Sequence, residues 1–327
     1  MKPLRRRPGV SLVAALLPLL ALPAATSGQT MRSQCAAAVG PGVQNFCGNV
    51  TDAALILQPR LGLAASGGNP VPGTASTLGM RIGSTPRFSL GLRATAADVG
   101  LPPVERVASD GDVDFLVGSV SMDAAVGVFE GFSLLPTVGG FASVDLLGSI
   151  GVVPLSRGEN FDGDASVTWA VGAQVGLLRE SFTAPGVTVS GMYRRLGDVT
   201  YGDATLADRD AFFSLTDHSV KSLRATVGKR VLGFGLLAGA GYDRYTGDVM
   251  GSVRDGLPID PDRTVDFGES SLSQSRTSFF GNASFTLIIL NMAVELGWQE
   301  GGDADGDATE RLEDGSVFGG VSVRLVI

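Results

Sequence analysis

The stretch SVKSLRATVGKRVLGFGLLAGAGYDRYT, residues 219–246, decides the fold. In its first half Leu223, Ala225 and Val227 alternate with polar residues, and in its second half apolar residues alternate mostly with glycine. Strict alternation gives a strand one apolar face and one polar or minimal face. A soluble β-sandwich shows the same alternation. About ten residues per strand and an inner face of arginine and glycine instead favour a hairpin of a membrane barrel.

The same period of two recurs along the chain. It predicts further strands at 55–63, 78–82, 88–92, 120–132, 144–152, 167–177, 187–197, 279–285, 292–298 and 317–327. The connections between strands are by turns short (84–86, 133–138, 179–186, 229–231, 287–290) and long and acidic (96–111, 154–164, 199–218, 247–271, 301–314). We therefore predict an all-β fold, a single antiparallel up-and-down transmembrane β-barrel of about twelve strands, within a range of ten to fourteen. Its turns would be periplasmic and its longer acidic loops extracellular.

The N-terminus carries the pattern of an export signal. Residues 1–28 begin with basic residues, continue with an apolar run from Val10 to Leu22 and end with small residues, which favours a secretory signal peptide. A membrane-anchoring helix is the alternative, but the apolar run is shorter than the roughly 20 residues that a span needs. Residues 29–52 are predicted to be a periplasmic N-terminal segment, and residues 53–327 the barrel.

The chain has two cysteines, Cys35 and Cys47, which lie just after the signal. Because the exported chain meets an oxidising compartment, a disulfide between them is the favoured interpretation, and two free thiols are the alternative. The formal charge is −8, and removal of the signal takes away four basic residues and no acidic one. The phosphates of nucleic acids would repel such an acidic chain. We therefore expect no nucleic acid partner.

These features together resemble bacterial outer-membrane β-barrel proteins, of the porin-like or outer-membrane transport class. The resemblance rests on the signal, the strand pattern over 53–327 and the final strand Val317 to Ile327. It implies the outer membrane of a Gram-negative-type bacterium as location, and outer-membrane lipid and the assembly machinery as partners. The chain departs from the class in ending in Ile327 rather than an aromatic residue. Barrels of the fatty-acid-transporter type also carry a folded N-terminal plug, for which residues 29–52 are too few.

Alternation places a set of charges on the inner face of the predicted barrel. These lumen-lining residues are Arg60, Arg81, Arg93, Asp123, Asp145, Arg194, Arg224, Arg276, Glu295 and Arg324. More arginine than carboxylate would make an open lumen attract anions, whereas an ion-pair network that fills a narrow lumen is the equal alternative. Aromatic residues at the strand ends predict two membrane girdles, formed by Trp169, Tyr242 and Trp298 at the long-loop ends and by Phe88, Phe234 and Phe285 near the short turns.

The leading functional hypothesis is a passive channel or porin-like transporter for small, anionic or amphipathic solutes. A closed structural or surface-interaction barrel is the alternative. A third hypothesis, a barrel lipase or protease, would need His218, the single histidine, beside Asp217 and Ser219, but neighbours on a strand point to opposite faces. We expect no catalytic residues and no cofactor. A weak calcium candidate is the acidic run Asp303, Asp305 and Asp307, in which the glycine is misplaced for an EF-hand.

Overall fold

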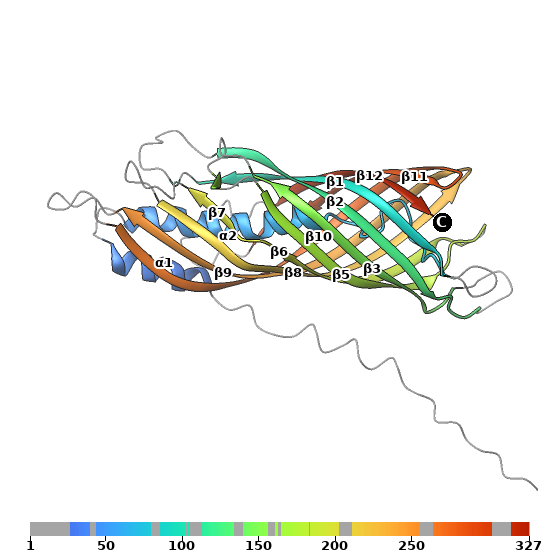
Figure 1. Cartoon of the computed structure of the whole chain (residues 1–327), viewed down its shortest axis with the longest axis horizontal. Coiled ribbons are helices and arrows are strands. Elements are labelled where there is room, and N and C mark those ends of the chain that lie inside the picture. Colours follow the sequence, from blue (N-terminus) through green and yellow to red (C-terminus); the bar gives the residue numbers. More distant parts are fainter. Residues whose placement is uncertain are drawn as a thin grey trace, which may run out of the picture.

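The computed structural model describes residues 27–39, 44–79, 86–102, 104, 113–133, 140–155, 161–162, 165–182, 184–202, 211–254, 264–302 and 315–326. Ten long antiparallel strands close a barrel (Figure 1). They are β1 (Phe88–Leu101), β2 (Val113–Phe129), β3 (Ser143–Pro154), β5 (Ala165–Leu178), β6 (Gly186–Leu196), β8 (Ala211–Val231), β9 (Phe234–Arg254), β10 (Thr264–Leu287), β11 (Leu290–Gln299) and β12 (Ser316–Val326). The prediction of an up-and-down outer-membrane type of barrel is confirmed.

The strands follow one another around the barrel in sequence order, and β12 closes the ring by pairing with β1. Two short strands, β4 (Phe161–Asp162) and β7 (Val199–Gly202), extend the sheet beside β8 and bring it to twelve strands. Short turns join the strands at one end of the barrel, which we call the turn end. The opposite end is the loop end. The turn of the 219–246 hairpin lies at Leu232 and Gly233, both with positive φ, which matches the twist of a tight hairpin.

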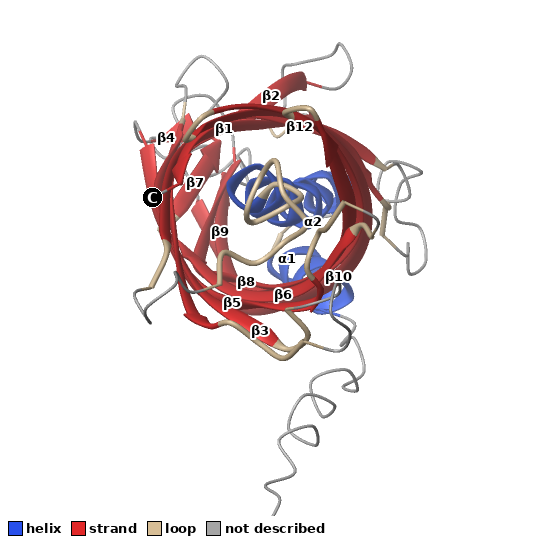
Figure 2. Cartoon of the chain, turned by 90° about the vertical axis from the view of Figure 1, so that its right-hand side faces the viewer, coloured by secondary structure: helices blue, strands red, loops and turns tan. Residues whose placement is uncertain are grey.

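The first two predicted strands are not part of the barrel. Residues 55–63, predicted as a strand, belong instead to the helix α2 (Gln44–Ser66), which follows α1 (Ser27–Ala38). Of the second predicted strand, Leu78 and Gly79 belong to no strand, and residues 80–85 lie outside the described residues. α2 lies inside the barrel (Figure 2), and α1 packs against α2 and β10. We call residues 27–39 and 44–79 the plug.

The helix forms because the apolar residues of this stretch also satisfy a helical spacing. Ala53, Leu57 and Leu61 recur every four residues, and all three are fully buried. Because the barrel wall surrounds α2, even Gln58 and Arg60 are buried, so no polar face marks the helix in the sequence. Of the predicted periplasmic segment 29–52, the described residues belong to α1 and α2, and α1 packs against β10 at the loop end of the barrel (Figure 1). The periplasmic location of this segment stays a prediction.

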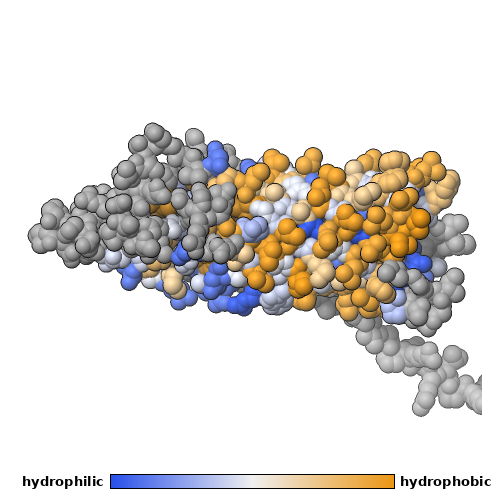
Figure 3. All heavy atoms as spheres, turned by 45° about the horizontal axis from the view of Figure 1, so that its top comes forward, coloured by the Kyte–Doolittle hydropathy of each residue, from blue (hydrophilic) through white to orange (hydrophobic). Residues whose placement is uncertain are grey.

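The alternation of apolar and polar residues changes phase halfway along the longest strands. Towards the turn end Leu223 and Leu236 point outward, and Arg224 points into the lumen. Towards the loop end Val220 and Tyr245 are buried inside, with Lys221 exposed outside. We call the first part the spanning half and the second the outer half. Figure 3 shows the apolar band over the spanning half and polar atoms beyond it.

Candidate functional site

Three side chains from different walls hold the C-terminal end of α2 in the lumen. Arg93 of β1 donates from Nη1 to the carbonyl oxygens of Ser66 and Asn69, both at 3.2 Å. Arg224 of β8 donates from Nε to Gly68 at 2.9 Å and from Nη2 to Gly67 at 3.1 Å. Cations suit the C-terminus of a helix, where carbonyl groups lack partners.

The third side chain is Glu295 of β11. Its two carboxylate oxygens accept hydrogen bonds from the backbone amides of Gly68, at 2.8 Å, and Asn69, at 2.9 Å. We call Arg93, Arg224 and Glu295 the latch. The latch grips backbone groups of the plug from three strands, so it fixes the chain where α2 ends without needing a particular plug side chain.

Two carboxylates neutralise the latch arginines. Asp243 pairs with Arg224 through two hydrogen bonds of 2.8 and 3.0 Å, and both side chains are buried. Asp123 pairs with Arg93, with 3.0 Å between Nε and Oδ2. Removing one partner of such a buried pair leaves an uncompensated charge, which costs about 3–5 kcal/mol.

A second anchor holds the far end of the plug on another wall. Asp145 of β3 accepts a hydrogen bond of 2.8 Å from the amide of Leu78, and Gly79 donates to the same carboxylate at 3.5 Å. The hydroxyls of Thr77 and Ser143 lie 2.6 Å apart. Between latch and anchor the segment is folded on itself, since Asn69 bonds the backbone of Val71 and Thr74. Residues 67–79 are thus held by polar contacts at both ends, while Val71 packs against Ala125 and Leu147 of the wall.

The outer half of the lumen is sealed by apolar packing instead. Leu57, Leu61 and Leu63 of α2 join a core that includes Phe213 and Leu272 of the wall. Pro59 within α2 cannot donate to the carbonyl of Leu55, which accepts a hydrogen bond of 2.9 Å from Gln274 of β10 instead.

The predicted disulfide between Cys35 and Cys47 is present and joins α1 to α2. Arg32 and Asp52 add an ion pair of 2.8 Å between the same two helices.

The structure places the predicted lumen charges as follows. Arg93, Asp123, Asp145, Arg224 and Glu295 contact or support the plug, as described above. Arg194 and Arg324 are buried in the lumen, Arg276 lies half-buried on the inward register of β10, and Arg60 is buried on α2 rather than on a strand. Arg81 lies outside the described residues. The lumen is therefore filled in this structure.

The sequence analysis missed two parts of this site, namely Asp243 and residues 66–69, of which Asn69 makes the most contacts. Asp243 had a signal, since it lies on the polar register of the opening hairpin. The plug residues had none, because their role depends on the backbone amides and carbonyls that they present to the wall.

The predicted girdle residues lie on the outside of the barrel. Trp169 and Trp298 are each 44% exposed, and Tyr242, Phe88 and Phe234 are also exposed, with Phe285 half-buried against Phe234. They lie on the outer surface, but their role as girdles stays a prediction.

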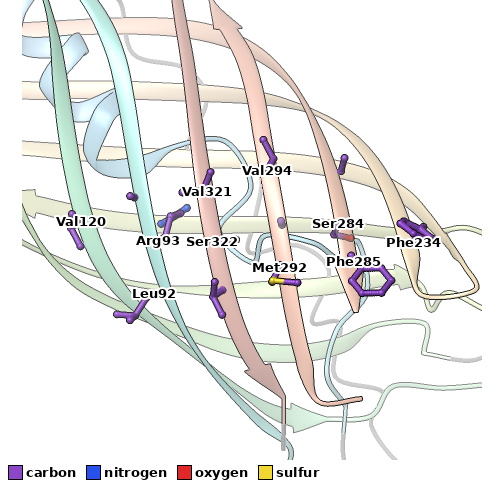
Figure 4. A pocket seen from close by; sticks show the side chains of 14 residues that line it. Leu92, Arg93, Val120, Phe234, Ser284, Phe285, Met292, Val294, Val321 and Ser322 are labelled. Carbon is purple, nitrogen blue, oxygen red and sulfur yellow. The ribbon is translucent and has the colours of Figure 1, made fainter. Parts of the chain in front are cut away.

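An open groove of about 640 Å³ lies on this outer wall across β1, β12, β11 and β10, with apolar lining that includes Leu92, Met292 and Val321 (Figure 4). It belongs to the lipid-facing surface.

His218 does not assemble a catalytic group with its neighbours. Its ring is buried in the outer half, and neither ring nitrogen has a hydrogen-bond partner among the described residues. Burial lowers the pKa of His218 to about 4. Ser219 instead faces Thr246, at 2.9 Å between hydroxyls, and Asp217 pairs with Arg195.

The described residues hold no cluster of three or more potential metal ligands. The calcium candidates Asp303, Asp305 and Asp307 lie outside the described residues. Within the described part of the chain, neither helix has the length and apolar character required of a membrane-crossing helix.

A closed barrel with an apolar outer band and a polar lumen defines the class: the chain is a transmembrane β-barrel of the outer-membrane type. No family model and no curated protein matches the chain. Among solved structures it is similar to the translocator domain of the autotransporter NalP from Neisseria meningitidis, with 12% identity, a TM-score of 0.34, and 84% of this chain and 96% of that chain covered. It is also similar to the outer-membrane protease OmpT from Escherichia coli, with 12% identity, a TM-score of 0.34, and 74% and 96% covered. A third similar structure is an outer-membrane channel from Pseudomonas putida F1, with 10% identity and a TM-score of 0.33. The match covers 79% of this chain and 99% of that chain.

Proposed function

We propose that the protein is a gated transport barrel for small solutes, closed at rest by its own plug. The observation that carries the proposal is the way residues 67–79 are held. Two carboxylates on different strands, Glu295 and Asp145, bind four backbone amides of this segment. Such contacts can be exchanged for water when the segment moves, whereas a lumen that never opens is more simply filled by side chains of the wall.

Passage through the whole lumen also requires α2 to shift in the outer half, where its contacts are apolar. A solute suited to both halves combines an apolar part with an anionic group, because Arg194 and Arg324 of the spanning half are buried without an ion pair among the described residues. We propose no catalytic role, which the isolation of His218 from Ser219 and Asp217 supports.

A second candidate function is favoured by the outer half. Its strands continue beyond the apolar band, and their interior is a packed apolar core around α1 and α2. Such a rigid extension is suited to a closed barrel that presents a platform at the cell surface.

Planar-bilayer conductance separates the two functions. We expect the wild-type protein to be silent and the double variant Glu295→Ala/Asp145→Ala to show brief openings. Adding Thr77→Cys and Ser143→Cys, whose hydroxyls now lie 2.6 Å apart, should silence the double variant when oxidised and restore openings on reduction. The double variant without the added cysteines, under the same reductant, controls for loss of the native disulfide. A double variant that stays silent would favour the platform.

A further inference from the structure

Arg194 is a buried arginine of the lumen that, like Arg324, forms no ion pair among the described residues. Arg194 on β6 is 2% exposed, and its Nη1 has no hydrogen-bond partner among the described residues. Unlike histidine or lysine, arginine does not escape this situation by losing its proton. A buried charge without a partner costs several kcal/mol, so the site must be completed by something else.

The neighbouring carboxylates are already engaged. Asp243 binds Arg224 in a bidentate pair, and Asp123 binds Arg93. Both carboxylate oxygens of Glu295 already accept hydrogen bonds from backbone amides of the plug. The arginines 93 and 224 lie close enough to Arg194 to repel it electrostatically, and only Asp123 partly offsets them.

Arg194 lines a small cavity between the plug and the wall. Its plug side is formed by Ser66, Gly68 and Pro70, and its wall side by Ser190, Met192, Arg194, Ser222 and Arg224. The cavity has about 10 Å³, room for about one water-sized particle. Two guanidinium groups and three hydroxyl groups line it, and none of the lining residues is a carboxylate.

A second cavity offers a direct comparison. It lies on another side of Pro70, has about 20 Å³, and is lined by Arg324 together with Asp123. The carboxylate of Asp123, although paired with Arg93, lines this cavity and disfavours an anion there, so we expect it to hold water.

We propose that the Arg194 cavity is a binding site for one small monovalent inorganic anion, chloride in the first instance. The anion accepts hydrogen bonds from Arg194 and from the hydroxyls of Ser190 and Ser222. Chloride is somewhat larger than water, and the flexible side chain of Met192 supplies the extra room. Because Ser66, Gly68 and Pro70 form one side of the site, the anion bridges the plug to the wall and stabilises the closed barrel. This proposal does not depend on transport.

The test uses the full mature chain, refolded in sodium bromide and crystallised. We expect one anomalous bromide peak beside Arg194, and none beside Arg324. A cavity that holds only water would overturn the proposal. In solution, the temperature at which the barrel unfolds on a heat-shift gel should be higher in chloride than in gluconate of equal ionic strength.

Variants then assign the effect to this residue. The chloride dependence should vanish in Arg194→Gln and persist in the matched control Arg324→Gln. A dependence of wild-type size in Arg194→Gln, or none in the wild type, would contradict the site. If Arg194→Gln does not fold, Ser222→Ala takes its place, with a rightward shift of the chloride titration expected, and an unchanged titration counting against the site.

Discussion

Truncating the latch carboxylate should free the plug segment without unfolding the barrel. Glu295→Ala removes the acceptor of two amide hydrogen bonds, of 2.8 and 2.9 Å, from Gly68 and Asn69. A hydrogen bond to a charged group contributes about 1.5–3 kcal/mol, so the pair contributes about 3–6 kcal/mol. Since about 1.4 kcal/mol corresponds to a factor of ten, the open population of residues 67–79 should rise by about 10²- to 10⁴-fold.

The assay is the rate at which a bulky water-soluble maleimide labels a cysteine placed at Ala75. Ala75 is buried in the plug between latch and anchor, so labelling requires the segment to move. When closing is faster than labelling, the rate scales with the open population. Glu295→Gln keeps one carbonyl acceptor and should give an intermediate rate.

Glu130→Ala is the matched control for loss of a carboxylate. Glu130 is exposed and pairs with Arg179 near the turn end, and exposed pairs contribute about 0–1 kcal/mol. A labelling rate in Glu295→Ala within about threefold of the control would refute the idea that Glu295 holds the plug.

Three further predictions concern the outer half. A methyl group added at Gly62 would lie 2.5 Å from the buried ring of Tyr245, so Gly62→Ala should destabilise the plug by about 1–3 kcal/mol. A methyl group at Gly48 would meet only the end of the Arg32 side chain, at 3.9 Å, so Gly48→Ala should stabilise α2 by about 0.5–1 kcal/mol. Urea titration of both variants checks this, and equal effects would contradict it. His218 stays neutral in the folded protein down to its pKa of about 4, while the unfolded chain takes up the proton near pH 6.5, so stability should fall by about 3 kcal/mol between pH 6.5 and 4, and unfolding curves of His218→Leu should lack this part of the pH dependence. An epitope tag inserted between Gly28 and Gln29, where α1 begins at the loop end, should bind antibody on intact cells, and binding only after lysis would reverse the orientation.

The spanning half could be predicted from the sequence because lipid imposes one rule on every strand. Leu223 and Val227 must face lipid and Arg224 must not, so the period of two stays in one phase wherever the bilayer is. The inward positions of Arg93, Asp145 and Glu295 followed from the same rule.

The outer half obeys the opposite rule, and this is why its strands were predicted as loops. Ala211, Phe213 and Leu215 alternate as cleanly as any spanning strand, but they face an interior core. The phase change between Val220 and Leu223 interrupts the pattern, so residues 199–218 and 247–271 gave no continuous strand signal with the hairpin. The signal was present in the sequence, but a β-bulge between Thr216 and Ser219 turns these three residues inward.

The plug could not be predicted because its leucines satisfy two periods at once. Leu55, Leu57, Leu61 and Leu63 fit a strand, and Leu57 with Leu61 also fits a helix. Only the surrounding wall decides between them, since it buries every side of α2. Glu295 and Asp145 bind backbone amides of the plug, and every residue except proline has such an amide. The side chains of the plug therefore gave no sign of these contacts in the sequence.

The phase change also fixes how deeply each long strand lies in the bilayer. A strand of 21 residues such as β8, at about 3.3 Å per residue, is about 70 Å long, far more than the apolar thickness of about 25 Å that a tilted barrel must match. Strand length therefore leaves the vertical position of the barrel in the bilayer undetermined, and the point where apolar residues turn from outside to inside sets it. Moving that point by two residues, with a tilt of about 40°, would sink or raise the whole molecule by about 5 Å.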